Sequence, residues 1–262
     1  MQINRKALAA AVLAIGAFGA VQAFGSTGSQ QEFRQSYALA AGGSVIIDNP
    51  YGDVRISAWD REEVRIEAIK SAPDSRRLDD AQIVVDSTSD TLSIRTQYAG
   101  ADAEHPASVK YRITVPRSAN LDDVHLVNGG LSIRGLQGAV KATSVNGDIR
   151  AERLEGTADL STVNGQVEAD FHRISPANAI SLRSVNGPIV LSIPPGAGAQ
   201  LLAQNLSGGI LTDFGSPEVG ERGHRFHAIL KGGGARIHLE NVNGGISIHS
   251  TWSRRRRERP GI

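Results

Sequence analysis

The sequence predicts an all-β protein, in which a β-solenoid or β-helix-like stack of short strands with Asn-Gly turns follows a β-rich N-terminal part. Three observations lead to this fold class. A short motif returns at a nearly fixed period, polar and apolar residues alternate between its copies, and the chain combines 29 glycines with only 5% aromatic residues and no cysteine. Self-similarity at a short period is the signature of a repeat architecture. The lack of cysteine excludes a disulfide framework and thiolate chemistry.

The repeated motif is Val-Asn-Gly-x-(Leu/Ile/Val), and its four clear copies begin at Val127, Val145, Val163 and Val185. The first three glycines lie 18 residues apart, and the fourth follows after 22. Looser copies occupy residues 206–210 and 242–246, and residues 51–54 resemble another. We expect the Asn-Gly pairs to be structural turns, because glycine lacks Cβ and asparagine can hydrogen-bond its own backbone. The predicted turn residues are Asn128, Gly129, Asn146, Gly147, Asn164, Gly165, Asn186, Gly187, Asn243 and Gly244.

Each repeat is predicted to contain two short strands and two turns. Residues 148–151 alternate polar and apolar, which is the period of a strand with one buried face. Glu155-Gly156 supplies a second turn, and residues 157–163 form a second strand. We expect the apolar residue before each Asn-Gly and the one two positions after it to point to the same side.

Two architectures fit this pattern. In a β-solenoid, successive repeats stack, and Ile149 and Val167 form an internal ladder. In a hairpin meander, each Asn-Gly is a tight turn between antiparallel neighbours. The solenoid is favoured, because stacked repeats place equivalent residues in one environment and therefore favour the same turn chemistry every 18 residues.

The predicted domain of this solenoid-like, adhesin type spans residues 43–250. Residues 24–42 are expected to be a flexible leader with a first short strand, and residues 251–262 a basic C-terminal tail. Residues 76–81 are expected to form a helical turn, and residues 100–107 a surface loop. In the N-terminal part, strands are predicted over residues 44–48, 53–59, 64–68, 82–86, 91–96 and 109–115.

Residues 1–23 have the features of a secretory signal. Arg5 and Lys6 precede an uncharged apolar run from Ala7 to Val21, and Val21-Gln22-Ala23 is a cleavage site of the small-x-small type. A membrane anchor is the alternative, but the run is shorter than the roughly 20 residues that span a bilayer. We expect an exported protein, periplasmic, at the cell surface or secreted, with no transmembrane span in the mature chain.

Charge is unevenly distributed along the mature chain. Without Arg5 and Lys6 the chain has 26 basic and 27 acidic residues, and the tail contributes +4, so that the remaining body is −5. An acidic body argues against nucleic-acid binding.

The tail offers a possible contact for an anionic ligand, such as a lipid phosphate or an acidic polysaccharide. The alternative is a solvated tail that prevents end-to-end stacking. The residues concerned are Trp252, Arg254, Arg255, Arg256 and Arg257.

A longer duplication overlies the short repeat. Pro116 and Pro195 are each followed after 13 residues by a motif glycine, Gly129 and Gly208, which gives a constant shift of 79. With its Val-Asn-Gly copies, this order resembles the bacterial putative-adhesin family, a domain of unknown function. The resemblance covers roughly residues 43–250 and rests on residues 115–116, 127–129, 145–149, 163–165, 193–194, 206–210, 213–214, 232–234, 237 and 242–246. It implies a repetitive β-solenoid-like fold and an envelope-associated, non-catalytic protein, with no catalytic residues to transfer.

Candidate chemistry is weak outside the turns. Paired carboxylates at a suitable separation are required for glycoside hydrolysis, yet here the carboxylates alternate with Arg150 and Arg153, as on a solvated strand face. His224-x-x-His227 could begin a metal site, but strand spacing places i and i+3 on opposite faces. Residues 232–234 resemble a phosphate-binding loop superficially and are expected to be a tight corner. The carboxylates considered are Asp148, Glu152, Asp159, Glu168 and Asp170, and the further late histidines are His238 and His249.

The sequence therefore predicts an exported, non-enzymatic cell-envelope protein without cofactor, metal or catalytic residues. It would act as an adhesin-like binding or scaffold module that contacts glycan, lipid head groups or another protein. Two alternatives remain open at this stage. One is a polysaccharide-active enzyme that uses carboxylates on a solenoid face, and the other is a sensor or regulator of envelope stress.

Overall fold

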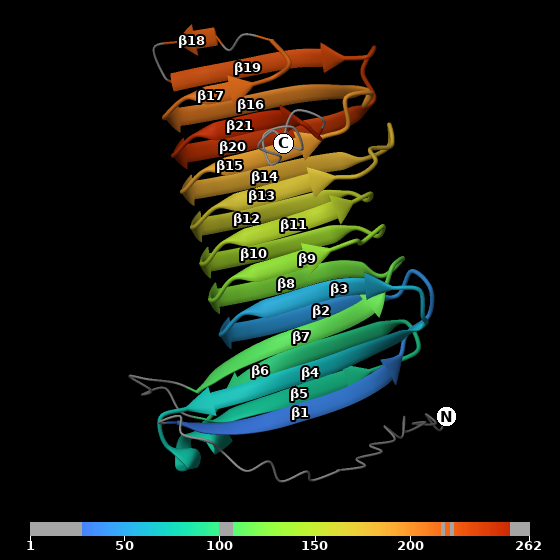
Figure 1. The fold of residues 1–262 in the computed structure, drawn as a ribbon, viewed down its shortest axis with the longest axis vertical. Helices are drawn as coiled ribbons and strands as arrows, with labels where there is room; N and C mark the ends of the chain where they lie inside the picture. The colour runs from blue at the N-terminus through green and yellow to red at the C-terminus, as the bar shows by residue number, and fades with distance from the viewer. Residues whose placement is uncertain (1–27, 100–106, 216–217, 221–222, 252–262) are drawn as a thin grey trace, which may run out of the picture.

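The computed structural model describes residues 28–99, 107–215, 218–220 and 223–251, so the predicted signal and most of the tail lie outside the described residues. The chain forms an elongated all-β structure with two long sheets (Figure 1). Sheet A runs in the order β1 (Ser29–Ala38), β4 (Glu63–Ala72), β7 (Ser108–Pro116), β3 (Val54–Trp59), β9 (Leu131–Arg134), β11 (Ile149–Leu154), β13 (Val167–Phe171), β15 (Ile189–Ile193), β21 (Ile246–Ser250) and β17 (Ile210–Thr212). Sheet B runs in the order β18 (Glu218–Gly220), β19 (Gly223–Leu230), β16 (Ala199–Ser207), β20 (Ala235–Asn243), β14 (Ala179–Asn186), β12 (Ala158–Asn164), β10 (Val140–Asn146), β8 (Asn120–Asn128), β2 (Ser44–Tyr51), β6 (Thr91–Tyr98) and β5 (Ala81–Ser87).

Each predicted repeat contributes one strand to each sheet. We call a sheet B strand and the sheet A strand that follows it a layer, and the Asn-Gly segment between them a corner. Neighbouring layers pair in parallel at the repeat spacing, with Asn146 beside Asn164 and Ile149 beside Val167. The predicted ladder of Ile149 and Val167 is confirmed, and both side chains are fully buried. Antiparallel pairing, which a hairpin meander requires, does not join these layers.

The core lies between the two sheets and follows the period-two alternation of each strand. Inward positions carry Val, Ile, Leu and Ala, and Phe171 is the largest fully buried side chain. One expectation about direction is wrong. The valine before each Asn-Gly points outward, and Val163 is 41% exposed, whereas Thr162 takes the inward position and is 2% exposed. The alternation along β12 starts from buried Leu160 and therefore assigns the last inward place to Thr162.

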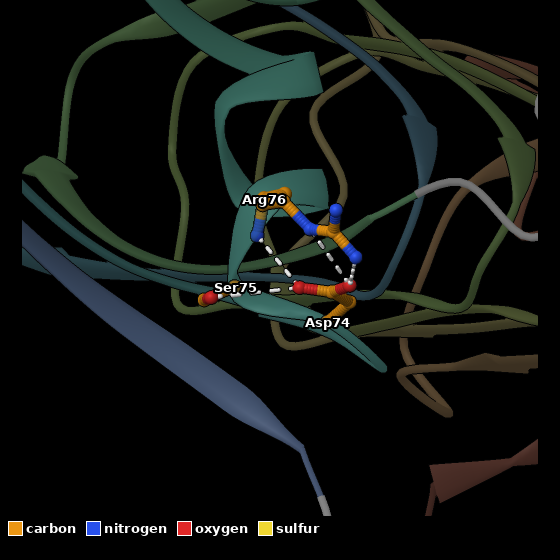
Figure 2. A network of polar contacts seen from close by, with 3 residues as sticks. All are labelled: Asp74, Ser75 and Arg76. Carbon is orange, nitrogen blue, oxygen red and sulfur yellow. Dashed lines mark hydrogen bonds and ion pairs between the residues drawn. The ribbon is translucent and has the colours of Figure 1, made fainter.

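The N-terminal strands lie where the alternation predicts them. β2 continues beyond the predicted strand of residues 44–48 to Tyr51, and Asn49 is buried. The expected leader includes β1, which pairs antiparallel with β4 over all ten of its residues. The predicted helical turn is the 3₁₀-helix η1 (Ser75–Asp80), capped by Asp74, which accepts from the Arg76 backbone N at 3.0 Å and from the Arg76 guanidinium (Figure 2).

The order of layers follows the chain only in the middle of the stack. The β2/β3 layer lies between β6/β7 and β8/β9. At the other end, β20/β21 lies between β14/β15 and β16/β17. The long duplication has a structural counterpart, because β8 (120–128) and β16 (199–207) coincide at the shift of 79.

Candidate functional site: the asparagine corners

The corner glycines are required by the distance between layers. A Cβ built on Gly147 would lie 2.0 Å from the carbonyl oxygen of Gly129, and one on Gly165 would lie 2.3 Å from that of Gly147. Each corner therefore lies against the backbone of the corner in the adjacent layer, with no room for a side chain between them. Gly187 and Gly244 also have φ of +143°, which favours glycine independently. A residue with a Cβ would have to separate the layers at these positions.

The corner asparagines form a ladder that runs along the stack. We define the asparagine ladder as Asn128, Asn146, Asn164, Asn186 and Asn243. Each Nδ2 donates to the Oδ1 of the adjacent layer, over 2.9 Å from Asn146 to Asn128, 2.8 Å from Asn164 to Asn146, 2.9 Å from Asn186 to Asn164 and 3.0 Å from Asn243 to Asn186. All five side chains are exposed. The expected bond of each asparagine to its own backbone is replaced by a bond between layers.

A second row, not predicted from the sequence, lies inside the corner. Two positions before the corner asparagine, a buried polar side chain donates to the backbone carbonyl of a neighbouring corner. Thr162 Oγ1 reaches Gly147 O at 3.0 Å, and Ser184 Oγ reaches Gly165 O at 3.1 Å. The signal was a polar residue at an inward position of an apolar pattern. We define the inner polar row as Asn49, Ser144, Thr162, Ser184, Asn241 and Asn205.

The inner polar row ends differently at the two ends of the stack. Near the N-terminal end, Thr96 Oγ1 bonds both Asn49 Oδ1, at 2.9 Å, and the Tyr111 hydroxyl, at 2.8 Å. Burial raises the pKa of Tyr111 to about 12, and its hydrogen bond with Thr96 lowers the pKa in part. Near the C-terminal end, Asn241 Oδ1 and Asn205 Oδ1 are buried and accept no hydrogen bond from the described residues.

An apolar row borders the asparagine ladder on the outer face of sheet B. We define the valine row as Val145, Val163, Val185, Val242 and Leu206, which precede the corners of β10, β12, β14, β20 and β16. The pairing registers place these residues side by side in this order. Val163 is 41%, Val185 38% and Leu206 61% exposed, so apolar surface continues across several strands.

Four of the five candidate carboxylates are held by arginines or by the backbone. Arg150 lies 2.9 Å from Glu168, Arg183 lies 2.8 Å from Asp159, and Arg134 lies 3.4 Å from Glu152. Asp148 is a corner residue whose Oδ1 accepts from the backbone N of Gln166 at 2.8 Å. Glu168 is 4% exposed, although it occupies an outward position of β13. These ion pairs neutralise the strand face, whereas a glycosidase needs one carboxyl free to act as an acid.

The late histidines are dispersed. His249 lies 3.6 Å from Asp213, and His238 lies 3.9 Å from Glu240. Within the described residues, no group of three or more His, Cys, Asp or Glu is placed to hold a metal ion. Residues 232–234 all have positive φ and connect β19 to β20 in a tight turn.

The predicted anionic contact at Trp252 and Arg254–Arg257 lies outside the described residues. Among the residues that the structure describes, no helix has both the length and the apolar character needed to cross a bilayer.

These features define a class of protein, a long all-β stack whose repeated residues serve layer-to-layer contacts. No protein-family model and no curated protein matches the chain. Among solved structures, the fold is similar to a putative cell adhesion protein from Clostridium sporogenes ATCC 15579, with a TM-score of 0.53 and 11% identity over 84% of this chain and 100% of that chain. A putative adhesin from Bacteroides fragilis NCTC 9343 matches with a TM-score of 0.33 and 12% identity over 85% and 98%. The likeness to the Clostridium sporogenes structure confirms, for the fold, the resemblance to adhesin-type proteins.

Proposed function

We propose that this protein is an exported, non-enzymatic module of the cell envelope that binds or scaffolds in the manner of an adhesin. Residues 43–250 would form its β-solenoid, in which each layer is one coil. The observation that carries this proposal is the repetition of the outer surface from layer to layer, which offers a long array of equivalent contacts. The similarity in fold to the Clostridium sporogenes cell adhesion protein supports it.

Export depends on the segment before the described residues. Residues 1–23 would direct secretion and be removed, leaving a mature chain that begins at Phe24. The mature chain would then meet envelope glycan, lipid head groups or another envelope protein. Trp252 and Arg254–Arg257 would add a contact for anionic groups, because each guanidinium offers bidentate hydrogen bonds to phosphate or carboxylate.

The non-enzymatic part of the proposal rests on the ion pairs. Hydrolysis of a glycosidic bond requires one carboxyl that donates a proton and a second that acts as base or nucleophile. Glu168, Asp159 and Glu152 instead lie beside arginines on the strand faces. The repeated carboxylates are thus explained as part of the surface charge balance.

Co-sedimentation of purified residues 24–262 with bacterial envelope fractions tests the proposal, with an assay for released reducing sugar in the supernatant. A version that ends at Ser250 is the matched control for the tail. We expect saturable binding without sugar release, and a loss in the shortened version would assign the contact to the tail. Sugar release, or no binding to any envelope fraction, would contradict the proposed function.

A further inference from the structure

We propose that the valine row and the asparagine ladder together bind an extended, neutral polysaccharide chain that lies along the stack, perpendicular to the strands. This inference rests on the proposed function and names the binding surface and the ligand class. The surface lies on the outer face of sheet B, at the C-terminal ends of its strands, just before the corners.

The two rows are continuous although the chain order is not. Asn186 lies beside Asn243 in the register of β14 and β20, and Ser207 of β16 follows Asn243. The inserted β20/β21 layer therefore extends both rows. Each row covers five strands, which with adjacent strands about 4.8 Å apart is roughly 20 Å from first to last, and the two rows share the four strands β10, β12, β14 and β20. A chain of several sugar units fits a track of this length and narrow width.

The asparagine amides retain hydrogen-bonding capacity toward solvent. An amide has two N–H donors and a carbonyl oxygen with two lone pairs. In the ladder, Asn146, Asn164 and Asn186 each use one N–H and one lone pair for the neighbouring layers. Each interior member can therefore still donate one bond and accept one. Sugar hydroxyls, which both donate and accept, match this alternation of donors and acceptors.

The valine row supplies the apolar half of the surface. A sugar ring presents C–H groups on its faces, which pack on exposed aliphatic side chains, while its hydroxyls project at the edges. Val163, Val185 and Leu206 expose 41%, 38% and 61% of their surface beside the ladder. Neither row contains a charged residue. An uncharged ligand suits such a surface, whereas lipid phosphate or an acidic polymer would find no cation within it.

A second copy of the protein is a less suitable occupant. A standard protein–protein interface draws on about 20–30 residues from each partner. The two rows offer ten residues, namely the five of the valine row and the five of the asparagine ladder. They also follow the edge where sheet B ends at its corners (Figure 1). A thin chain can contact both rows on the four strands that they share.

The test is depletion of the secreted protein from solution by two neutral insoluble polysaccharides, cellulose and chitin, with alginate as an anionic polymer. Val163→Lys/Val185→Lys places two charges in the valine row. Ser161→Lys/Ser181→Lys adds the same charge at outward positions of the same strands and is the matched control. Thermal unfolding establishes that both variants fold.

We expect saturable binding to at least one neutral polymer, weakened by about tenfold or more in the valine variant and by less than about twofold in the serine variant. Equal binding by the two variants, or binding to alginate alone, would overturn the inference. Envelope binding without neutral-polymer binding would overturn it while the proposed function stands. Sedimentation that shows a dimer dissolved by Val163→Lys/Val185→Lys would assign the surface to a second copy and also overturn it.

Discussion

The middle of the stack and its two ends are built differently. From β8 to β15, layers that are consecutive in the chain pair with one another, and every pairing is parallel. At each end, one layer is out of chain order. Antiparallel strands finish both sheets at the N-terminal end and sheet B at the C-terminal end, whereas sheet A finishes there on the parallel strand β17. Where the repeat is regular, layers stack in the order of the chain. Where the repeat is interrupted, at the two ends, the order of the layers departs from that of the chain.

The two ends are also closed to different degrees. At the N-terminal end, sheet A finishes on the ten-residue β1, and η1 packs near β1, β4 and β5. At the C-terminal end, sheet A finishes on the three-residue β17, where Leu211 is 68% exposed. Very short edge strands limit pairing with other chains. At the N-terminal end, η1 packs near the last strand of sheet A, whereas at the C-terminal end the last strand of sheet A is very short.

The largest expected effect is in the middle of the core. Ile149→Asp places a charge between two layers, and we expect it to cost about 4 kcal/mol or more, or to prevent folding. Ile210→Asp, in the end layer with a neighbour on one side only, should cost less. Denaturant unfolding measures both changes in the free energy of unfolding. Unchanged stability of Ile149→Asp would show that Ile149 does not face the core.

The next effect concerns the corners. Gly147→Ala directs a Cβ at the Gly129 carbonyl oxygen, 2.0 Å away, and should cost about 2–4 kcal/mol as the layers separate. Gly209→Ala in the end layer is the matched control, because no atom lies within 4 Å of its Cβ position. Thermal unfolding compares the two variants. Equal stability would refute close contact between corners.

The next prediction concerns the alkaline stability that Tyr111 provides at the N-terminal end of the inner polar row. Burial raises the pKa of Tyr111 to about 12 in the folded protein, above the ordinary value of about 10 for tyrosine. The neutral phenol is favoured by folding, so this stability is present below pH 10 and is lost as the pH rises toward 12. The shift corresponds to about 3 kcal/mol. Burial also raises the pKa of Tyr98, which acts in the same direction.

Urea unfolding between pH 9 and pH 12 measures this loss, on a scale that follows from the raised pKa of Tyr111. Tyr111→Phe removes the titrating group and should flatten the alkaline fall, leaving the part due to Tyr98. An identical fall in the two proteins would mean that the Tyr111 hydroxyl titrates as it does in water.

The smallest effect is at η1, which lies beside the N-terminal end. Hydrogen bonds from the Arg76 side chain and backbone lower the pKa of Asp74 to about 2 (Figure 2). The Asp74 carboxylate therefore stabilises η1 at pH values above the ordinary pKa of aspartate. This contribution disappears as the pH falls toward 2. Asp74→Ala should slightly lower the melting temperature at pH 7 and leave it unchanged at pH 2. A loss that is equal at both pH values would exclude the capping role.

Much of the middle could be predicted from the sequence, because its contacts are local and periodic. The spacing from Gly147 to Gly165 predicts the pairing of Ile149 with Val167. The place of β20/β21 could not be predicted, since the pairing of Ile189 with Ile246 depends on which layer packs best there and not on chain distance. The outward direction of Val163 was missed because Thr162 is polar, and its buried hydrogen bond to Gly147 is visible only in three dimensions.

Stacking follows the corners and overrides chain order at the ends. Disulfide cross-linking tests it most directly, because the chain has no cysteine of its own. Ser181 and His238 are register partners in β14 and β20, whereas Leu202 of β16 lies beyond His238. The account predicts that Ser181→Cys/His238→Cys forms a disulfide on oxidation and that Ser181→Cys/Leu202→Cys does not. The reverse result would place β16 next to β14 and contradict the inserted layer.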